Sequence, residues 1–189
     1  MFERTSYPTV GFYAGLILLL IVLAPFQAEW TERFLFEPTL KFQFWRLLSA
    51  HFSHWNWSHW WLNFAALLCF IVIYSKSLPW RHVAQVLAIL LSANAVLLLF
   101  FYQRDFYLGF SGLLYGLFIF AAIRNLASQT ILSLIVLSYL LAKAMSVYIF
   151  GEGATGDIGI PVAHEVHLFN ALLGVFIAFL WRRQELLLK

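Results

Sequence analysis

The sequence contains little charge: 11% of its 189 residues are Asp, Glu, Lys or Arg, whereas 62% are hydrophobic. A water-soluble domain of this size could not bury so much apolar surface. The basic residues are scattered between apolar blocks and form no stripe that could follow a phosphate backbone, which argues against a nucleic-acid partner. The composition therefore predicts an integral membrane protein in contact with lipid.

Cysteine is also nearly absent, and the single Cys69 excludes an intramolecular disulfide. Cys69 falls within an apolar block, where we expect a small buried residue with little thiolate character, and therefore no cysteine catalysis. His51, His54 and His59 taken alone could suggest a zinc site. No Glu or Cys completes a recognisable ligand spacing around them, so we expect neither a metal nor another cofactor.

Six apolar blocks are long enough, or nearly so, to cross a hydrocarbon core of about 30 Å, which takes roughly 20 helical residues. The first block could be mistaken for a secretory signal peptide, but five further blocks favour a retained anchor. There is no internal repeat and no low-complexity linker. We therefore expect a single all-α membrane domain over residues 1–189. Its six transmembrane helices should lie near 9–26, 59–75, 83–102, 109–124, 130–150 and 162–181.

The distribution of Lys and Arg predicts the orientation, because cytoplasmic loops carry an excess of both. The excess is modest and is strongest at the C-terminus when both termini are cytoplasmic. Arg4, Lys76, Arg81, Arg124, Arg182, Arg183 and Lys189 then lie inside, against Arg33, Lys41, Arg46 and Arg104 outside.

Polar side chains inside membrane spans are costly and indicate function. Ser111 stands between Gly109 and Gly112 where the fourth apolar block begins. If a helix starts there, its free N–H groups and its positive dipole end favour a developing negative charge. The alternative is a packing notch, Gly112-x-x-x-Gly116, of the kind that lets membrane helices touch.

A serine hydroxyl needs a base to become a nucleophile, and histidine is the usual base near neutral pH. The last apolar block supplies His164 and His167, which are three residues apart and share roughly one helical face. His164 lies one turn nearer the surface, where an ordinary interfacial histidine is expected. His167 begins a stripe that could pack against the glycine notch and bring it toward Ser111. The stripe continues through Asn170, Gly174 and Ala178.

A third polar element lies at the start of the second apolar block, where His59 and Asn63 are four residues apart and share one helical face. Both side chains can donate a hydrogen bond in a site with little competing water, which is the requirement for holding an oxyanion. The five tryptophans between residues 45 and 61 are typical of an interfacial belt.

Together, these elements make the chain resemble a rhomboid intramembrane serine protease in its minimal six-span form. The family's G-x-S-G motif corresponds to Gly109-Phe110-Ser111-Gly112, and its H-x-x-x-N motif to His59-Trp60-Trp61-Leu62-Asn63. A W-R pair of the family's large first loop corresponds to Trp45-Arg46. Each fragment is short, but their order and their common membrane face carry the resemblance.

The resemblance implies that Ser111 is the nucleophile and His167 its general base, a dyad without a third carboxylate. It also implies that His59, Asn63 and the Ser111 backbone N–H hold the oxyanion. Tyr115, one turn after the serine, would support the His167 ring, and Gly109 and Gly112 would support the serine itself.

The chain departs from the family in the last block, where H-x-x-G-x-x-x-G is usual. Asn170 replaces the first glycine, while Gly174 retains the second. We expect Asn170 to hold the two helices slightly apart or to hydrogen-bond across them.

Within the family the chain resembles the rhombosortases, because it is short and because AKAMSVYIFGEG…GIPVAHEVHL joins its last two blocks. That resemblance implies an enzyme of the bacterial inner membrane with an active site open to the periplasmic side. Its substrates would be transmembrane-anchored proteins with a C-terminal GlyGly-CTERM tail, which consists of a small-residue motif, a transmembrane helix and a basic end.

Two other functions stay open at this point. A weak or inactive rhomboid-like protein would bind transmembrane helices without cutting them, although it would most simply lack Ser111 or His167. A small transporter would need polar groups through the whole membrane, whereas here they gather toward one face. Lys143 and Glu165 are expected to pair across the fifth and last blocks, because an unpaired intramembrane charge is costly.

Overall fold

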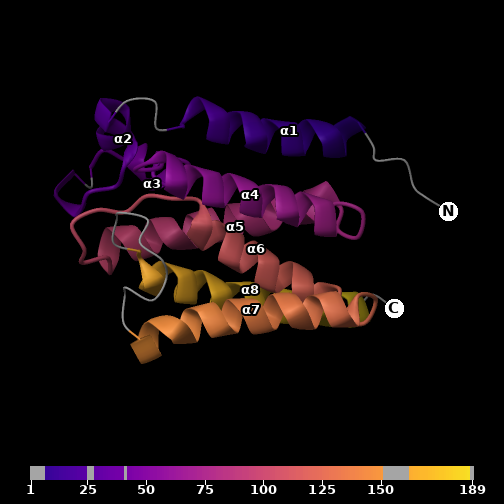
Figure 1. Cartoon of the computed structure of the whole chain (residues 1–189). Coiled ribbons are helices and arrows are strands. Elements are labelled where there is room, and N and C mark those ends of the chain that lie inside the picture. The colour runs from indigo at the N-terminus through magenta and orange to yellow at the C-terminus, as the bar shows by residue number, and fades with distance from the viewer. Residues whose placement is uncertain (1–6, 25–27, 41, 151–161, 188–189) are drawn as a thin grey trace. The chain divides into compact units, whose positions relative to one another are not determined.

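The chain folds into helices joined by short segments (Figure 1). The structure, a computed structural model, describes residues 7–24, 28–40, 42–150 and 162–187. The only extended pairing within these ranges is one antiparallel bridge between Phe36 and Tyr107, so the predicted all-α class is confirmed for them. The helices are α1 (Tyr7–Val22), α2 (Ala28–Phe34), a 3₁₀ turn (Pro38–Leu40), α3 (Arg46–Ser49), α4 (Trp57–Tyr74), α5 (Trp80–Phe100), α6 (Ser111–Arg124), α7 (Thr130–Phe150) and α8 (His164–Leu187).

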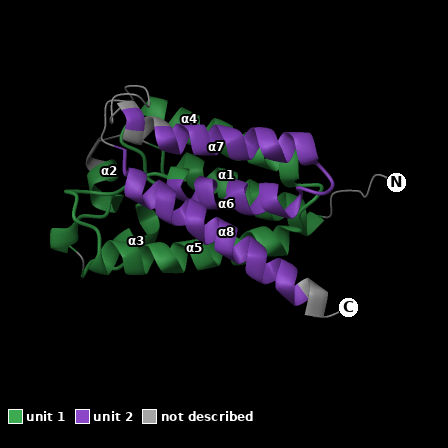
Figure 2. Ribbon diagram, turned by 90° about the horizontal axis from the view of Figure 1, so that it is seen from below, with its two compact units in different colours: residues 1–111 green, residues 112–189 purple. Residues whose placement is uncertain are grey.

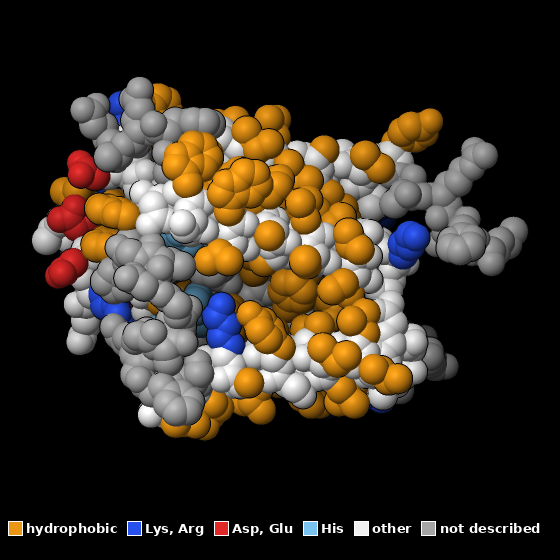
Figure 3. All heavy atoms as spheres, viewed as in Figure 1, with side chains coloured by type: hydrophobic (Ala, Val, Ile, Leu, Met, Phe, Trp, Pro, Cys, Tyr) orange, Lys and Arg blue, Asp and Glu red, His pale blue; other side chains and the backbone are white. Residues whose placement is uncertain are grey.

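Each predicted apolar block coincides with a helix, and the segment before α4 adds the short α2 and α3. Among the described residues, α4, α5 and the first part of α8, His164–Gln184, are long and apolar enough to cross a membrane. α1, α6 and residues Thr130–Met145 of α7 are apolar but shorter. Figure 3 shows apolar side chains along the helices, with acidic side chains gathered at the end that carries α2. The protein is a multi-pass membrane protein.

The helices group into two compact units, which Figure 2 shows in different colours. The first unit, residues 1–111, contains α1 to α5, and the second, residues 112–189, contains α7, α8 and all of α6 beyond its first residue. Ser111 is therefore the last residue of the first unit.

In the first unit, α4 begins at Trp57 because Asn56 caps it: the Asn56 side chain accepts a hydrogen bond from the His59 backbone N–H at 2.8 Å. Trp60 is buried, and its indole N–H donates to the Leu20 carbonyl of α1 at 2.9 Å. The prediction that all five tryptophans form an interfacial belt is therefore wrong for Trp60, which ties α4 to α1. The other four are exposed: Trp45, Trp55, Trp57 and Trp61.

The prediction that Cys69 is buried is also wrong, because its side chain is exposed on α4. The buried face of this helix passes through Leu67, Phe70 and Tyr74, at the three- and four-residue spacings of an α-helix. Cys69 falls outside that stripe, as does the exposed Val72. On a membrane-spanning helix such a face contacts lipid.

Residues 28–56, here called the first loop, are held by one buried arginine. Arg46 is 6% exposed, and its Nη1 donates to the carbonyls of Glu32 and Leu35 at 2.8 and 2.7 Å. A cation at the last carbonyls of a helix is favoured by the helix dipole, and here it satisfies groups at and just beyond the end of α2. In the Trp45-Arg46 pair, the arginine therefore fastens the first loop.

In the second unit, α6 is buried almost throughout, and every residue from 112 to 117 is buried. A helix that is apolar on all sides is expected to be buried in this way. α7 contacts α8, and Tyr115, Ile119 and Leu140 form a buried cluster with neighbours from α6, α7 and α8. Tyr115 is thus closely packed against its neighbours.

Candidate active site

The segment that leads into α6 is anchored to the first loop by backbone hydrogen bonds. Phe36 and Tyr107 exchange both N–H···O bonds of their bridge, at 2.9 and 2.8 Å, and the Gly109 N–H donates to the Ala50 carbonyl at 2.9 Å. The Tyr107 hydroxyl donates to the Gly109 carbonyl at 3.1 Å. Burial raises the pKa of the Tyr107 phenol, which therefore stays protonated as a donor. These bonds fix the corner from which α6 starts.

Gly109 occupies a position that residues with a Cβ fit poorly. Its φ of +116° lies in a region that residues with a Cβ rarely adopt. A Cβ built on Gly109 would also lie 2.7 and 2.8 Å from Cε1 and Nε2 of His59. The glycine therefore lets the imidazole of His59 lie directly against the backbone before Ser111.

A Gly109→Ala substitution should destabilise the first unit by roughly 1–3 kcal/mol, because it adds backbone strain and a clash with His59. Thermal unfolding in detergent, followed by tryptophan fluorescence, would measure the loss. Gly11→Ala is the matched control, because nothing lies within 4 Å of a Cβ at that position. Equal unfolding temperatures for the Gly109 and Gly11 variants would contradict the close contact between Gly109 and His59.

His59 is buried in α4 and presents one edge of its ring to Gly109. Its Nδ1 is buried and has no hydrogen-bond partner in the described part of the chain. A neutral imidazole carries one proton, and a proton on Nδ1 would leave a buried donor unsatisfied. The favoured tautomer therefore carries its proton on Nε2, as a donor aimed at the Gly109 corner.

Asn63 lies one turn further along α4 and is 3% exposed. Its Nδ2 donates to the His59 carbonyl at 3.0 Å, within the same helix. The amide nitrogen carries two protons, so this bond uses only one of its donors. The side chain is held in place by its own helix, and the second proton is the one that can donate to a ligand.

Ser111 is the first residue of α6, as the sequence predicts, and its side chain is half-buried. A Cβ built on Gly109 would lie 3.8 Å from Ser111 Oγ. The hydroxyl and the Nε2 edge of His59 therefore border the same space beside the Gly109 α-carbon. The structure brings together Ser111, Gly109 and His59, and the turn of α4 that carries His59 also carries Asn63.

In the second unit, the ring of His167 stacks on that of Tyr115, with centroids 4.5 Å apart and planes 8° from parallel. His164 approaches the His167 ring edge to face, with centroids 6.0 Å apart. Tyr115 belongs to α6, and both histidines belong to the first turn of α8. The aromatic contacts fix the plane of the His167 imidazole.

α6 and α8 come into close backbone contact at two glycines. A Cβ built on Gly174 would lie 2.5 Å from the Gly116 carbonyl oxygen and 3.1 Å from its α-carbon. The predicted small-residue contact between the last apolar block and the glycine notch is therefore confirmed at Gly116. Backbone contact of this kind is typical of small residues in membrane helices.

We expect Gly174→Ala to lower the unfolding free energy by about 1–3 kcal/mol, because a backbone atom cannot move aside as a flexible side chain can. Circular dichroism during thermal unfolding in detergent would measure the effect. Gly15→Ala adds the same methyl group to α1, where nothing lies within 4 Å, and should leave stability nearly unchanged. Similar losses in both variants would contradict a close α6–α8 contact.

Asn170, which replaces the family's first glycine, is fully buried. Its Nδ2 donates to the Val166 carbonyl of α8 at 2.7 Å. The amide thus bonds within its own helix, and one turn later the two backbones are still in contact through Gly174.

The expected pairing of Lys143 with Glu165 stays a prediction. Both side chains are exposed, one on α7 and the other in the first turn of α8.

The three histidines that could suggest zinc lie in the described part of the chain and are not grouped there as metal ligands. The described residues contain no group of three or more His, Cys, Asp or Glu side chains that could hold a metal ion. Instead, His51 and His54 are fully buried, and each meets one aromatic ring edge to face: Tyr107 for His51 and His59 for His54. Sequence reasoning missed these ring contacts, and the only sequence signal for them was the density of histidines before α4.

The fold and these contacts define an all-helical, multi-pass membrane protein in which a serine opens a buried helix beside an imidazole donor. A protein-family model described as Rhomboid domain matches residues 41–184. The chain therefore belongs to the rhomboid family, whose members are generally intramembrane serine proteases. The comparison with curated proteins gave no match.

Proposed function

We propose that this rhomboid protein is an intramembrane serine endopeptidase in which Ser111 is the nucleophile and His167 the general base. The observation that carries the proposal is the stacking of His167 on Tyr115. Tyr115 lies four residues after Ser111 in α6, so both residues occupy one face of the same helix. One helix thus carries the hydroxyl and the aromatic surface that orients the imidazole.

In this mechanism Ser111 Oγ attacks the carbonyl carbon of the scissile peptide bond, and His167 accepts the hydroxyl proton. His167 then passes that proton to the leaving amine, which breaks the C–N bond and leaves an acyl-enzyme. Water, deprotonated by His167, hydrolyses the ester and restores the serine. Stacking on Tyr115 supports this role because it holds the ring in one plane through both proton transfers.

The developing oxyanion would be held by the Nε2–H of His59, the Asn63 amide and the Ser111 backbone N–H. The burial of His59 and Asn63 supports this assignment, because hydrogen bonds to an anion are strongest where water is excluded. The φ of Gly109 and its lack of a Cβ allow His59 to approach. Gly112 follows the nucleophile and is buried in α6.

The proposed substrates are proteins anchored by a transmembrane helix, cut near the outer face of the membrane. The peptide bond to be cut must leave its helix first, and a glycine-rich stretch eases this because glycine costs a helix about 1 kcal/mol per residue. GlyGly-CTERM tails, proposed on the rhombosortase resemblance, combine such a stretch with a membrane anchor. The substrate would enter laterally beside α7.

The proposed setting is the bacterial inner membrane, with six spans, both termini in the cytoplasm and the active site open to the periplasm. The three long apolar helices and the three shorter ones support this topology.

A fluorophosphonate probe tests the nucleophile directly. Purified protein in detergent would be incubated with the probe, digested, and analysed by mass spectrometry to locate the modified residue. We expect modification at Ser111 and loss of labelling after heat denaturation. Modification of another serine would refute Ser111 as the nucleophile. Absence of labelling in folded protein would favour a rhomboid that binds helices without cutting them.

Co-expression tests the substrate class. A GlyGly-CTERM protein would be produced with and without this chain, and mass spectrometry would determine its mature C-terminus. We expect a shortened C-terminus only when the chain is present. An unchanged C-terminus together with positive probe labelling would reject the tail as substrate while leaving the protease assignment intact.

A further inference from the structure

His54 is a fully buried histidine that the proposed reaction does not use. It lies in the first loop, three residues before α4. Its ring meets the ring of His59 with centroids 5.0 Å apart and planes at 70°. The Cε1–Nε2 edge of His59 lies against Gly109, where a Cβ would come within 2.8 Å of the ring. The imidazole proposed as oxyanion donor therefore contacts both the His54 ring and the backbone at Gly109.

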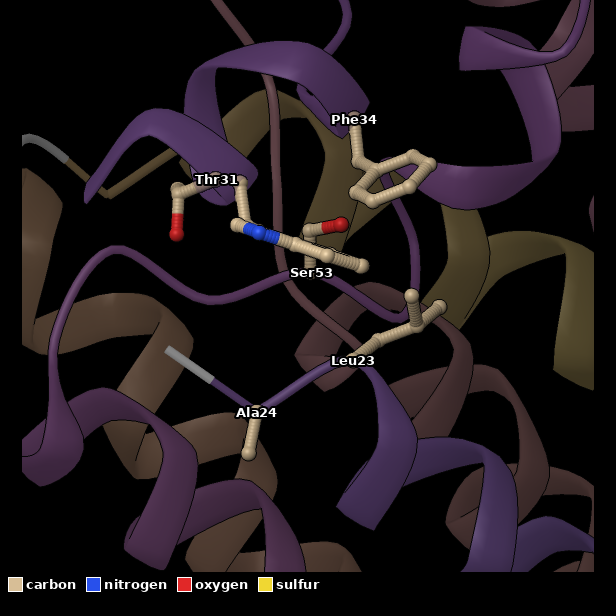
Figure 4. A pocket seen from close by; sticks show the side chains of 6 residues that line it. Leu23, Ala24, Thr31, Phe34 and Ser53 are labelled. Carbon is tan, nitrogen blue, oxygen red and sulfur yellow. The ribbon is translucent and has the colours of Figure 1, made fainter. Parts of the chain in front are cut away.

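The position of His54 depends on a residue further back along the chain. The Thr31 hydroxyl of α2 donates to the His54 carbonyl at 3.0 Å, and both residues are buried. Thr31 and Ser53 also line a small cavity of about 10 Å³ (Figure 4). That volume is close to what one water molecule needs. The hydrogen bond therefore joins α2 to the segment before α4 beside a small gap in the packing.

We propose that Thr31 and His54 are positioning residues that fix the His59 ring for oxyanion binding. This inference rests on the proposed function. Neither residue contacts substrate in this scheme. They act through the contact of the His54 ring with His59, and so they should affect the chemical step rather than the binding of the substrate helix.

The role requires the shape of the His54 ring and not its charge. Burial, together with the neighbouring His59, lowers the pKa of His54 to about 3, so the ring is neutral at physiological pH. A phenyl ring can make the same edge-to-face contact. His54→Phe should therefore keep the wild-type kcat, whereas His54→Ala should lower it.

The experiment measures kcat and KM for cleavage of a transmembrane substrate in proteoliposomes. Thr31→Val removes the hydrogen bond while keeping the shape, and should lower kcat about 3- to 10-fold at unchanged KM. His54→Ala should do the same, while Thr31→Ser and His54→Phe should stay near wild type. Thr39→Val is the matched control, because the Thr39 hydroxyl bonds to Glu37 on the exposed side of the same loop.

A double variant separates positioning from general stability. In a His59→Ala background, Thr31→Val should cause no further fall in kcat, because the ring it positions is gone. An additional fall of the same size, a change confined to KM, or a wild-type kcat for Thr31→Val would overturn the proposal. If wild-type protein neither cleaves substrate nor labels with fluorophosphonate, the proposed function itself fails. If the wild type is active and the Thr31 and His54 variants are equally active, only the proposed positioning role is refuted.

Discussion

A Ser111→Ala variant should cleave its transmembrane substrate on the order of 10⁴- to 10⁶-fold more slowly than wild type, because no other group can form the acyl-enzyme. Substrate binding should persist, since the substitution removes one oxygen from a half-buried side chain at the start of α6. The measurement is product formation in proteoliposomes, together with pull-down of intact substrate by the variant.

Ser58→Ala is the matched control for this substitution. Ser58 is exposed in the first turn of α4, so its loss should leave the rate unchanged. Cleavage by Ser111→Ala within tenfold of wild type would exclude Ser111 as nucleophile. In that case the glycines after Ser111 would serve only as the packing notch Gly112-x-x-x-Gly116, the alternative that the sequence left open.

His167→Ala should slow cleavage by a comparable factor, because the hydroxyl of Ser111 is a weak nucleophile without a base. Residues that act as one unit give strongly non-additive losses. The Ser111→Ala/His167→Ala double variant should therefore be about as slow as Ser111→Ala alone. A further large fall in the double variant would mean that His167 serves a step independent of the serine.

The contact between His164 and His167 supplies the sharpest control for the base. His164→Ala should keep fluorophosphonate labelling at Ser111, whereas His167→Ala should lose it. The reverse pattern would make His164 the base and would leave His167 as its aromatic support. His82→Ala, in the first turn of α5, controls for loss of an imidazole elsewhere.

The helices could be predicted from the sequence because long apolar blocks set their length and position directly. The candidate site could be predicted in part, because Gly109 and Ser111 stand together in the chain and His59 and Asn63 are one helical turn apart. The contact of Gly174 with Gly116 also follows from residue size, since only small residues leave room for backbone contact. These features depend on local spacing, which a sequence displays.

The supporting contacts could not be predicted from the sequence. They join residues that are far apart in the chain, and no helical or strand periodicity relates them. The Thr31 hydroxyl reaches a carbonyl 23 residues away, and the Trp60 indole reaches one 40 residues away. Cys69 was placed wrongly for a related reason: an apolar block does not show which of its faces meets lipid. Only the three-dimensional arrangement distinguishes an interfacial tryptophan from one that joins two helices.

The bond from Trp60 to the Leu20 carbonyl has a consequence for the boundaries of the folded unit. The family match begins at residue 41, yet side-chain hydrogen bonds join α1 to Trp60 of α4 and join Thr31 of α2 to His54. A truncated protein that begins at the matched segment would lack α1 and α2. It would expose the Trp60 indole N–H to hydrocarbon and release the loop that carries His54. α1 and α2 are thus held in the folded protein by contacts that reach into the matched segment.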